Sequence, residues 1–337
     1  MMLEISLLNL RAYLRLFTHI QLLPILESGE ETLVGGQAVM EGVMMRAPHS
    51  YCVAVRKADG EIVTEERPLA RLSEQHRIFK WPVMRGLGSL GQAMWLGMKA
   101  LRFSADTMMQ DAGAEKEKVE KEKKDVSSWA MWGNIAFSFL FFIFLYKFVP
   151  LFLATWIGHH VPAAGSRLAI NLVDGSIRIL LFLGFLILIS RMKDIHRVFE
   201  YHGAEHKVVF NYESGRPVTV ENSQRFVTWH PRCGTSFLLV VMVIAMVFYA
   251  FLPFDSFLAK LAARILLLPL ITGVSYELIR FAAKRQKGLM AILTRPGLWL
   301  QRITTQPPSD SQAEVAIHAL EHAMQLEKAQ GGELVIA

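Results

Sequence analysis

Four long apolar stretches dominate the pattern of hydrophobic and polar positions along the chain. Each approaches the roughly 20 mostly apolar residues that a helix needs to cross the hydrocarbon core of a bilayer. The stretches are residues 129–153, 169–190, 236–253 and 259–279. Only a short segment separates the last two, which we therefore expect to form a hairpin. The pattern predicts an α-helical integral membrane protein with about four transmembrane helices.

Polar segments precede, separate and follow the apolar stretches. Residues 1–32 have the pattern of an amphipathic helix that lies on a surface. Residues 33–81 predict a small β-rich unit, because two alternating strands flank an Asp59-Gly60 turn. Residues 82–128 combine a glycine-rich helix, either interfacial or re-entrant, with a charged linker. The other predicted units are transmembrane helices 1 and 2 (129–190), a polar loop (191–235), a transmembrane hairpin (236–279) and a tail with an amphipathic helix (280–337).

Basic residues between the apolar stretches indicate the orientation of the chain. The 191–235 loop contains seven Lys and Arg residues, whereas the loop between the first two stretches has only Arg167. Cytoplasmic loops of membrane proteins carry an excess of such residues. We therefore expect both termini, the β-rich unit and the 191–235 loop on the cytoplasmic side.

Composition narrows the class of protein. Of the 337 residues, 52% are hydrophobic and 20% are charged, which indicates separate lipid-embedded and polar parts. The net charge of +6 is attributed to cytoplasmic loops, so we expect no nucleic-acid partner. Two cysteines, Cys52 and Cys233, are too few for a disulfide framework and favour a thiol or metal-ligand role. Asp174 and Arg178, four residues apart in the second stretch, are interpreted as a structural ion pair.

The main candidate for chemistry follows the second apolar stretch. Residues 202–206 read His-Gly-Ala-Glu-His, which is the H-x-x-E-H order. On a helix, His202 and His206 share one face and can bind one ion, and Glu205 lies beside them. In proteins with this order both histidines bind zinc and the glutamate takes a proton from bound water. The motif therefore predicts a zinc site.

The identity of the further ligands decides what such a site does. His230 and Cys233 form a second close pair, and two pairs separated by a loop are typical of closed, structural four-ligand zinc sites. Alternatively, Glu277 at the cytoplasmic end of the fourth stretch supplies a third ligand and leaves a position open for water. Both arrangements remain open at the level of the sequence.

A second polar cluster lies in the glycine-punctuated segment 35–48. Gln37, Glu41 and Arg46 are its candidate functional residues. Tight turns at the glycines allow Glu41 and Arg46 to share a surface that closes over the metal site or binds a partner. The simpler interpretation is turn chemistry with exposed charge.

Four segments together resemble a known family. "GGQAVMEGVMMRAP", "EYHGAEHKVVFNYESG", "HPRCGTSFL" and "YELIRFAAK" are similar, in this order, to the YqhQ family of bacterial multispanning membrane proteins. The resemblance covers about residues 30 to 325 and includes every candidate site residue named above. It implies a multi-pass protein of the bacterial cytoplasmic (inner) membrane. Members of this family carry a domain of unknown function and are labelled as candidate metal-dependent enzymes, without an established reaction.

Two functions of different classes fit these observations. The first is a cytoplasm-facing, membrane-embedded zinc hydrolase that acts on a peptide or lipid-linked substrate at the inner membrane surface. The second is a non-catalytic assembly factor that binds a membrane-protein partner, with the His/Cys cluster as a structural zinc or hydrogen-bond site. The sequence specifies neither the substrate nor the oligomeric state.

Overall fold

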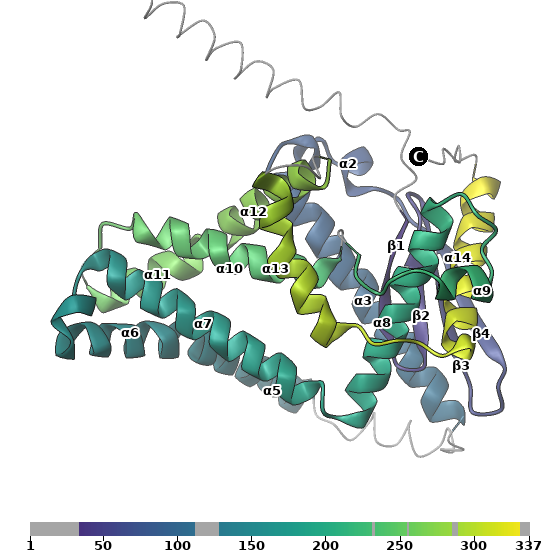
Figure 1. Cartoon of the computed structure of the whole chain (residues 1–337), viewed down its shortest axis with the longest axis horizontal. Helices are drawn as coiled ribbons and strands as arrows, with labels where there is room; N and C mark the ends of the chain where they lie inside the picture. The colour runs from purple at the N-terminus through teal and green to yellow at the C-terminus, as the bar shows by residue number, and fades with distance from the viewer. Residues whose placement is uncertain (1–33, 112–127, 231–232, 255, 285–288, 331–337) are drawn as a thin grey trace, which may run out of the picture.

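The computed structural model describes residues 34–111, 128–230, 233–254, 256–284 and 289–330. The predicted amphipathic helix at 1–32 and most of the charged linker lie outside the described residues. Figure 1 shows the apolar helices gathered on one side and a small sheet with its covering helices on the other.

The N-terminal part of the described chain is a four-stranded antiparallel sheet in the order β1-β2-β3-β4. The Asp59-Gly60 turn joins β3 and β4, and Gly60 adopts φ 92°, which favours glycine. The glycine-punctuated segment supplies the two other strands. The strands are β1 (Gly35–Val39), β2 (Gly42–Arg46), β3 (Ser50–Arg56) and β4 (Ile62–Pro68).

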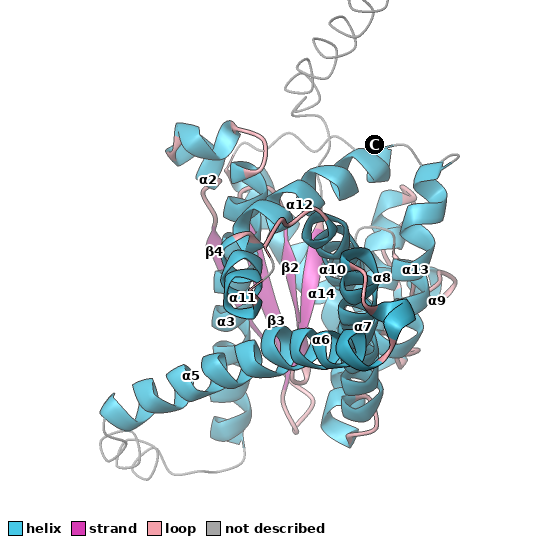
Figure 2. Cartoon of the chain, turned by 90° about the vertical axis from the view of Figure 1, so that its left-hand side faces the viewer, coloured by secondary structure: helices cyan, strands magenta, loops and turns pink. Residues whose placement is uncertain are grey.

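Helices cover both faces of the sheet. Val43 and Cys52 point to one face, against helices α8 (Lys193–Glu213) and α14 (Asp310–Ala329). Met44 and Val53 point to the other face, against α3 (Met84–Asp111). Because both faces are buried, β2 and the first half of β3 are nearly continuous apolar runs instead of alternating ones. Figure 2 shows the strands enclosed by helices.

The predicted interfacial or re-entrant segment is part of α3. Its Leu96 and Ala100 are fully buried against the sheet, and Met94 and Met98 on another face are exposed. This helix is not among the candidate membrane spans. Helix α3 therefore belongs to the sheet unit.

The apolar stretches form helices, but fewer of them qualify as spans than the four predicted. Ala136–His160 and Arg167–Ile189 are long and apolar enough to cross a membrane, and Phe257–Leu266 with Leu268–Phe281 make a third if that pair, bent by 49°, is one span. Helix α10 (Gly234–Ala250) is apolar but has 17 residues, about 26 Å at 1.5 Å per residue. The described residues thus contain two or three candidate spans.

The first candidate span is not a regular α-helix. Helix α5 (Ser128–Ile143) continues through a π-helical turn, η3 (Phe144–Phe148), into α6 (Val149–His160). The other helices are α2 (Leu72–Gln75), η2 (Arg77–Lys80), η4 (Pro162–Ala164), α7 (Arg167–Ile189), α9 (Val220–Gln224), α11 (Phe257–Leu266), α12 (Leu268–Lys284) and α13 (Leu289–Thr304).

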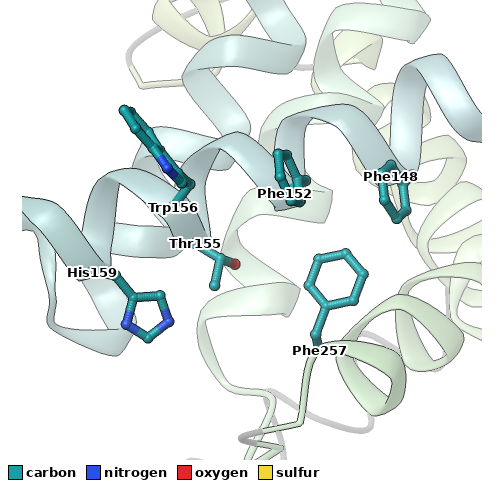
Figure 3. A pocket seen from close by; sticks show the side chains of 6 residues that line it. All are labelled: Phe148, Phe152, Thr155, Trp156, His159 and Phe257. Atoms are coloured by element: carbon teal, nitrogen blue, oxygen red, sulfur yellow. The ribbon is translucent and has the colours of Figure 1, made fainter.

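The surface of the apolar helices is rich in exposed aromatic and aliphatic side chains. Phe137 and Phe139 on α5 are 67% and 64% exposed, and Leu188 on α7 is 69% exposed. A wide-open apolar groove of about 440 Å³ lies between α6 and α11, with Phe148 and Phe257 at one end (Figure 3). Contiguous apolar surface of this kind marks a face that contacts lipid or another protein.

Candidate metal centre

Helix α8 presents the central motif on one of its faces. Tyr201, Ala204 and Val208 pack into the core beneath the sheet. His202 and His206 lie on an adjacent face, with ring centroids 4.5 Å apart. The helical spacing predicted from the sequence therefore brings the two imidazoles together.

Cys233 completes a group of three ligand atoms. One nitrogen each from His202 and His206 and the sulfur of Cys233 all lie within 4.8 Å of one another. Cys233 Sγ is 3.3 Å from His202 Nε2 and 3.1 Å from Thr235 Oγ1. Cys233 is the N-cap residue of α10, so the start of an apolar helix meets the histidine face of α8.

Main-chain carbonyl groups orient both imidazoles. His202 Nδ1 donates to Thr304 O at 2.8 Å, and His206 Nδ1 donates to Thr228 O. A carbonyl oxygen only accepts, so each Nδ1 carries a proton, and in the neutral imidazole each Nε2 keeps its lone pair. Metal-binding histidines in proteins are held in this way by an acceptor at the other ring nitrogen.

Gly203, between the two histidines, allows the segment that holds His202 to come close. A Cβ atom on Gly203 would lie 2.0 Å from Gln306 O. The Gln306 N–H donates to Phe199 O at 2.9 Å, which pins this segment to α8. The glycine of the motif is thus required by packing.

Glu205 lies on the wall of a small polar cavity with the three ligands. Glu205 is 5% exposed, and its Oε2 atom is 3.4 Å from His206 Nε2. Strand β1 forms another wall of the cavity. It packs so closely on α8 at this point that a Cβ atom on Gly36 would lie 2.7 Å from Glu205 Cγ. The cavity measures about 110 Å³ and is lined by Val34, Gly35, Gly36, His202, Glu205, His206, Val209, His230, Cys233 and Gly234.

His230 lines the same cavity but is not part of the three-residue group. Its ring centroid is 5.6 Å from that of His206, and its Nε2 is 3.4 Å from Glu213 Oε2. Gln301 holds its main chain through bonds of 2.7 Å to the N–H and 2.8 Å to the carbonyl. Burial lowers the pKa of His230, while Glu205 acts to raise it. A neutral imidazole therefore stands next to the group.

Glu277 is held elsewhere by a basic residue of α3. Arg85 Nε donates to Glu277 Oε1 at 2.7 Å, and Arg85 Nη2 bonds to Oε2. The N–H of Val83 donates to the same carboxylate at 3.3 Å. The structure does not bring Glu277 to the ligands from α8 and α10.

Gln37, Glu41 and Arg46 hold the sheet between its covering helices. Glu41, at φ 52°, accepts from Arg197 Nη2 at 2.6 Å and from the hydroxyl of Tyr201 at 3.2 Å, both on α8. Gln37 Nε2 donates to Ala93 O at 3.2 Å, and Arg46 Nη2 to Gln92 Oε1 at 2.9 Å, both on α3. The predicted shared surface of Glu41 and Arg46 is therefore not formed, and none of the three lines the metal cavity.

Several contributors to the site were not identified from the sequence. The carbonyl groups of Thr228 and Thr304 and the backbone of Gly36 act through main-chain atoms, which carry no side-chain signature. Gln301 acts on the main chain of His230 from another helix. In the sequence, only the glycines of "GGQ" could have indicated that β1 packs closely against α8 at Glu205.

Comparisons with known proteins agree with the family resemblance. The family described as "Protein of unknown function (DUF1385)" matches residues 81–326. One relative, the "Uncharacterized protein YqhQ" of Bacillus subtilis (strain 168), is 37% identical over 298 residues, which cover 87% of this chain and 92% of that protein. No solved structure matches the chain.

Proposed function

This chain belongs to the YqhQ (DUF1385) family of proteins of unknown function, and we propose that it is a membrane-bound, zinc-dependent hydrolase. One observation carries the proposal. His202 and His206 expose unprotonated Nε2 atoms to Cys233 in a cavity that also contains the carboxylate of Glu205. Three protein ligands and a nearby base are the arrangement of catalytic zinc sites.

The donor set favours zinc among the metals available to proteins. Two imidazole nitrogens and one thiolate suit a tetrahedral zinc ion, whereas calcium and magnesium prefer oxygen ligands. Bound zinc would act as a Lewis acid and lower the pKa of a coordinated water to about 7. With Cys233 as the third ligand, Glu277 is not needed to complete the site.

Glu205 is the residue that we propose to move the proton. In hydrolysis, the water oxygen forms a bond to the carbonyl carbon of the substrate while the bond to the leaving group breaks. The Glu205 carboxylate accepts the proton of the attacking water and then donates it to the leaving group. The cavity of about 110 Å³ has room for the reacting group only, so the rest of the substrate must lie outside.

The position of the centre suggests where such a substrate is found. Helix α8 starts four residues after the end of candidate span α7, and Cys233 caps apolar helix α10. The basic residues of the 191–235 loop favour a cytoplasmic location. We therefore infer a substrate at the inner surface of the bacterial cytoplasmic membrane, either a peptide or a lipid-linked molecule.

His230 supports a second candidate function. Its imidazole lies on the same cavity wall, so a change of position would make it a fourth protein ligand. The zinc site would then be closed and structural. In that case the protein would be an assembly factor that binds another membrane protein.

Cobalt substitution of the purified full-length protein distinguishes the two functions. Cobalt(II) reports thiolate ligation and coordination number through its absorption spectrum. For the hydrolase we expect a thiolate-to-metal band that Cys233→Ser abolishes, and a spectral change when acetohydroxamate is added, because one position is open. A spectrum unaffected by acetohydroxamate but changed by His230→Ala would establish the closed site instead.

Variants of the motif supply the controls. We expect His206→Ala to lose the metal and Glu205→Gln to retain it while losing hydrolysis. His322→Ala is the matched control, because His318 and His322 form a second pair at the same spacing and His322 Nδ1 lies 3.3 Å from Glu66. Metal-free protein that His206→Ala leaves unchanged would contradict both zinc functions.

A further inference from the structure

A cluster of buried charges lies among the apolar helices, away from the metal centre. Lys147, Asp174, Arg178 and Arg264 surround Tyr249, and each of the five is 7% exposed or less. Tyr249 is near the end of α10 and Cys233 caps its start, so the length of this helix, about 26 Å, separates the two sites. The predicted pair of Asp174 and Arg178 is thus part of a larger group.

Two arginines share one carboxylate in this cluster, and a lysine lies beside the same tyrosine ring. Arg178 Nη2 donates to both oxygens of Asp174, at 3.0 and 2.9 Å. Arg264 Nη1 lies 2.8 Å from Asp174 Oδ2. Lys147 Nζ and the two guanidinium carbons lie 4.9 to 5.5 Å from the ring centroid of Tyr249. All three basic side chains therefore lie close to the ring of Tyr249.

The charges of the cluster do not balance. Neutral groups are its other acceptors: Asn171 Oδ1 bonds to Arg264 at 2.5 Å, and Tyr249 Oη bonds to Lys147 at 3.3 Å. Arginine does not lose its proton in proteins, so at least one positive charge is in excess, and two if Lys147 is charged. Buried charge without a counterion is strongly unfavourable, and more so between membrane helices.

Among the residues that the structure describes, several donors of the two arginines have no hydrogen-bond acceptor. Arg178 Nη1 and Arg264 Nε are fully buried and unpaired, and Arg264 Nη1 has only its ion-pair contact with Asp174. Buried polar atoms in native proteins are nearly always bonded. These donors are therefore suited to an anion with several acceptor oxygens.

Two interruptions of helical structure meet at the cluster. Lys147 lies in the π-helical turn η3, and Arg264 lies three residues before the 49° bend between α11 and α12. Phe148 and Phe257, from η3 and α11, are in contact with ring centroids 5.5 Å apart. Single π-helical turns and broken membrane helices are frequent at binding sites.

We propose that this cluster is a binding site for an oxyanion, namely the phosphate group of a small solute or of an anionic lipid. The phosphate oxygens accept from Arg178 and Arg264 and neutralise the excess charge. Opening at the α11/α12 bend admits the anion. For the lipid form, the apolar groove that starts at Phe148 and Phe257 offers a place for the acyl chain (Figure 3).

Binding to the purified full-length protein tests this proposal in two arms. The first arm titrates inorganic phosphate against chloride at constant ionic strength and follows the thermal unfolding temperature. The second arm compares nanodiscs that contain phosphatidic acid with nanodiscs of phosphatidylcholine alone, and counts bound lipid by native mass spectrometry. A response in the first arm identifies a solute, and a response only in the second identifies a lipid.

Variants of the cluster decide whether the binding is at this site. We expect Arg178→Gln to raise the Kd at least tenfold. Lys260→Gln, which removes a basic residue one turn before Arg264 on the same helix, should change the Kd by less than twofold. Asp174→Asn should lower the Kd severalfold, because it removes the competing carboxylate, whereas a purely structural network predicts lost stability without tighter binding.

Two results would overturn the proposal. One is the absence of binding in both arms. The other is a Kd of Arg178→Gln equal to that of Lys260→Gln. If Arg178→Gln does not fold, the Asp174→Asn variant decides, and an unchanged or higher Kd rejects the site.

Discussion

One close contact in the candidate metal cavity brings together two groups that both accept hydrogen bonds. Glu205 Oε2 and His206 Nε2 are 3.4 Å apart, and both carry lone pairs when the imidazole is neutral, because Thr228 O holds its proton on Nδ1. Two acceptors that face each other in a buried cavity repel. A cation or a proton between them removes this repulsion. The same geometry therefore supports both metal binding and a role for Glu205 as a base.

At the residue scale, Gly203 gives a first prediction. We expect Gly203→Ala to destabilise the fold by about 1–3 kcal/mol, because the new Cβ atom would overlap with Gln306 O. The displaced segment also carries Thr304, which orients His202, so zinc affinity should fall as well. Chemical denaturation and a competitive zinc titration measure the two effects.

Gly91→Ala is the matched control for that substitution. Gly91 lies inside helix α3, and a Cβ atom there would meet nothing within 4 Å. Alanine at this position should leave zinc affinity unchanged and stabilise the helix by about 0.4–1 kcal/mol. Equal stability of the two variants would show that the contact at Gln306 is not tight.

The two cysteines should differ in reactivity. Burial raises the pKa of Cys52 to about 12, with Glu66 and Glu65 adding to the shift. At pH 8 only about one Cys52 side chain in 10⁴ is then a thiolate, so iodoacetamide should label Cys52 only after unfolding. Cys233, half-buried at the cavity, should react in the metal-free protein and be protected by zinc. Peptide mass spectrometry reads both sites, and rapid labelling of native Cys52 would contradict this assignment.

The elements around the site are held together by polar contacts that run from the sheet in two directions. Glu41 ties the β1–β2 turn to α8, whereas Gln37 and Arg46 tie the sheet to α3. Gly36 of strand β1 forms one wall of the candidate metal cavity. The contact of Glu41 with α8 therefore also positions this wall. The polar residues of the glycine-punctuated segment thus act on the site through the position of β1.

A double-mutant cycle on Glu41 and Arg197 measures that contact. The pair is bidentate but partly exposed, with Arg197 53% and Glu41 20% accessible, so we expect a coupling energy of about 0.5–1 kcal/mol. Glu41→Gln and Arg197→Gln should each weaken zinc binding slightly, and the double variant no more than either one. Additive losses of stability would show that the two side chains act independently.

The whole molecule joins a polar unit to an apolar one, and the candidate metal centre lies at their junction. In Figure 1, α5, α6, α7, α10 and α11 lie on the left and the sheet with α8 and α14 on the right. Helix α8 follows α7 almost directly, and α10 returns from Cys233 into the apolar side. The candidate site is therefore built from both units, the polar one through α8 and the apolar one through α10.

Cysteine labelling in intact cells tests this division. Ala163, in the connection between α6 and α7, and Ala329, at the end of α14, are both exposed. A membrane-impermeant maleimide should label Ala163→Cys in intact cells and Ala329→Cys only after lysis, because the proposed topology places them on opposite sides of the membrane. Labelling of both in intact cells would rule out the proposed topology.

The sequence by itself determined the features that depend on near neighbours in the chain. The Asp59-Gly60 hairpin, the apolar helices and the spacing of His202 and His206 follow from local periodicity and turn chemistry. Of the four predicted spans, two or three are long and apolar enough within the described residues, because α10 has 17 residues and the last pair is bent. The family was also correctly identified from four short segments.

Only the tertiary structure decided which distant groups meet. The sequence allowed either His230 and Cys233 or Glu277 as further ligands, and the fold brings Cys233 next to the two histidines, whereas Arg85 holds Glu277 on α3. It also shows that Asp174 and Arg178 are part of a charge cluster with Lys147 and Arg264. These outcomes depend on the packing of elements far apart in the chain and on main-chain carbonyl groups. Neither the packing of distant elements nor the position of a main-chain carbonyl group can be read from the order of side chains in the sequence.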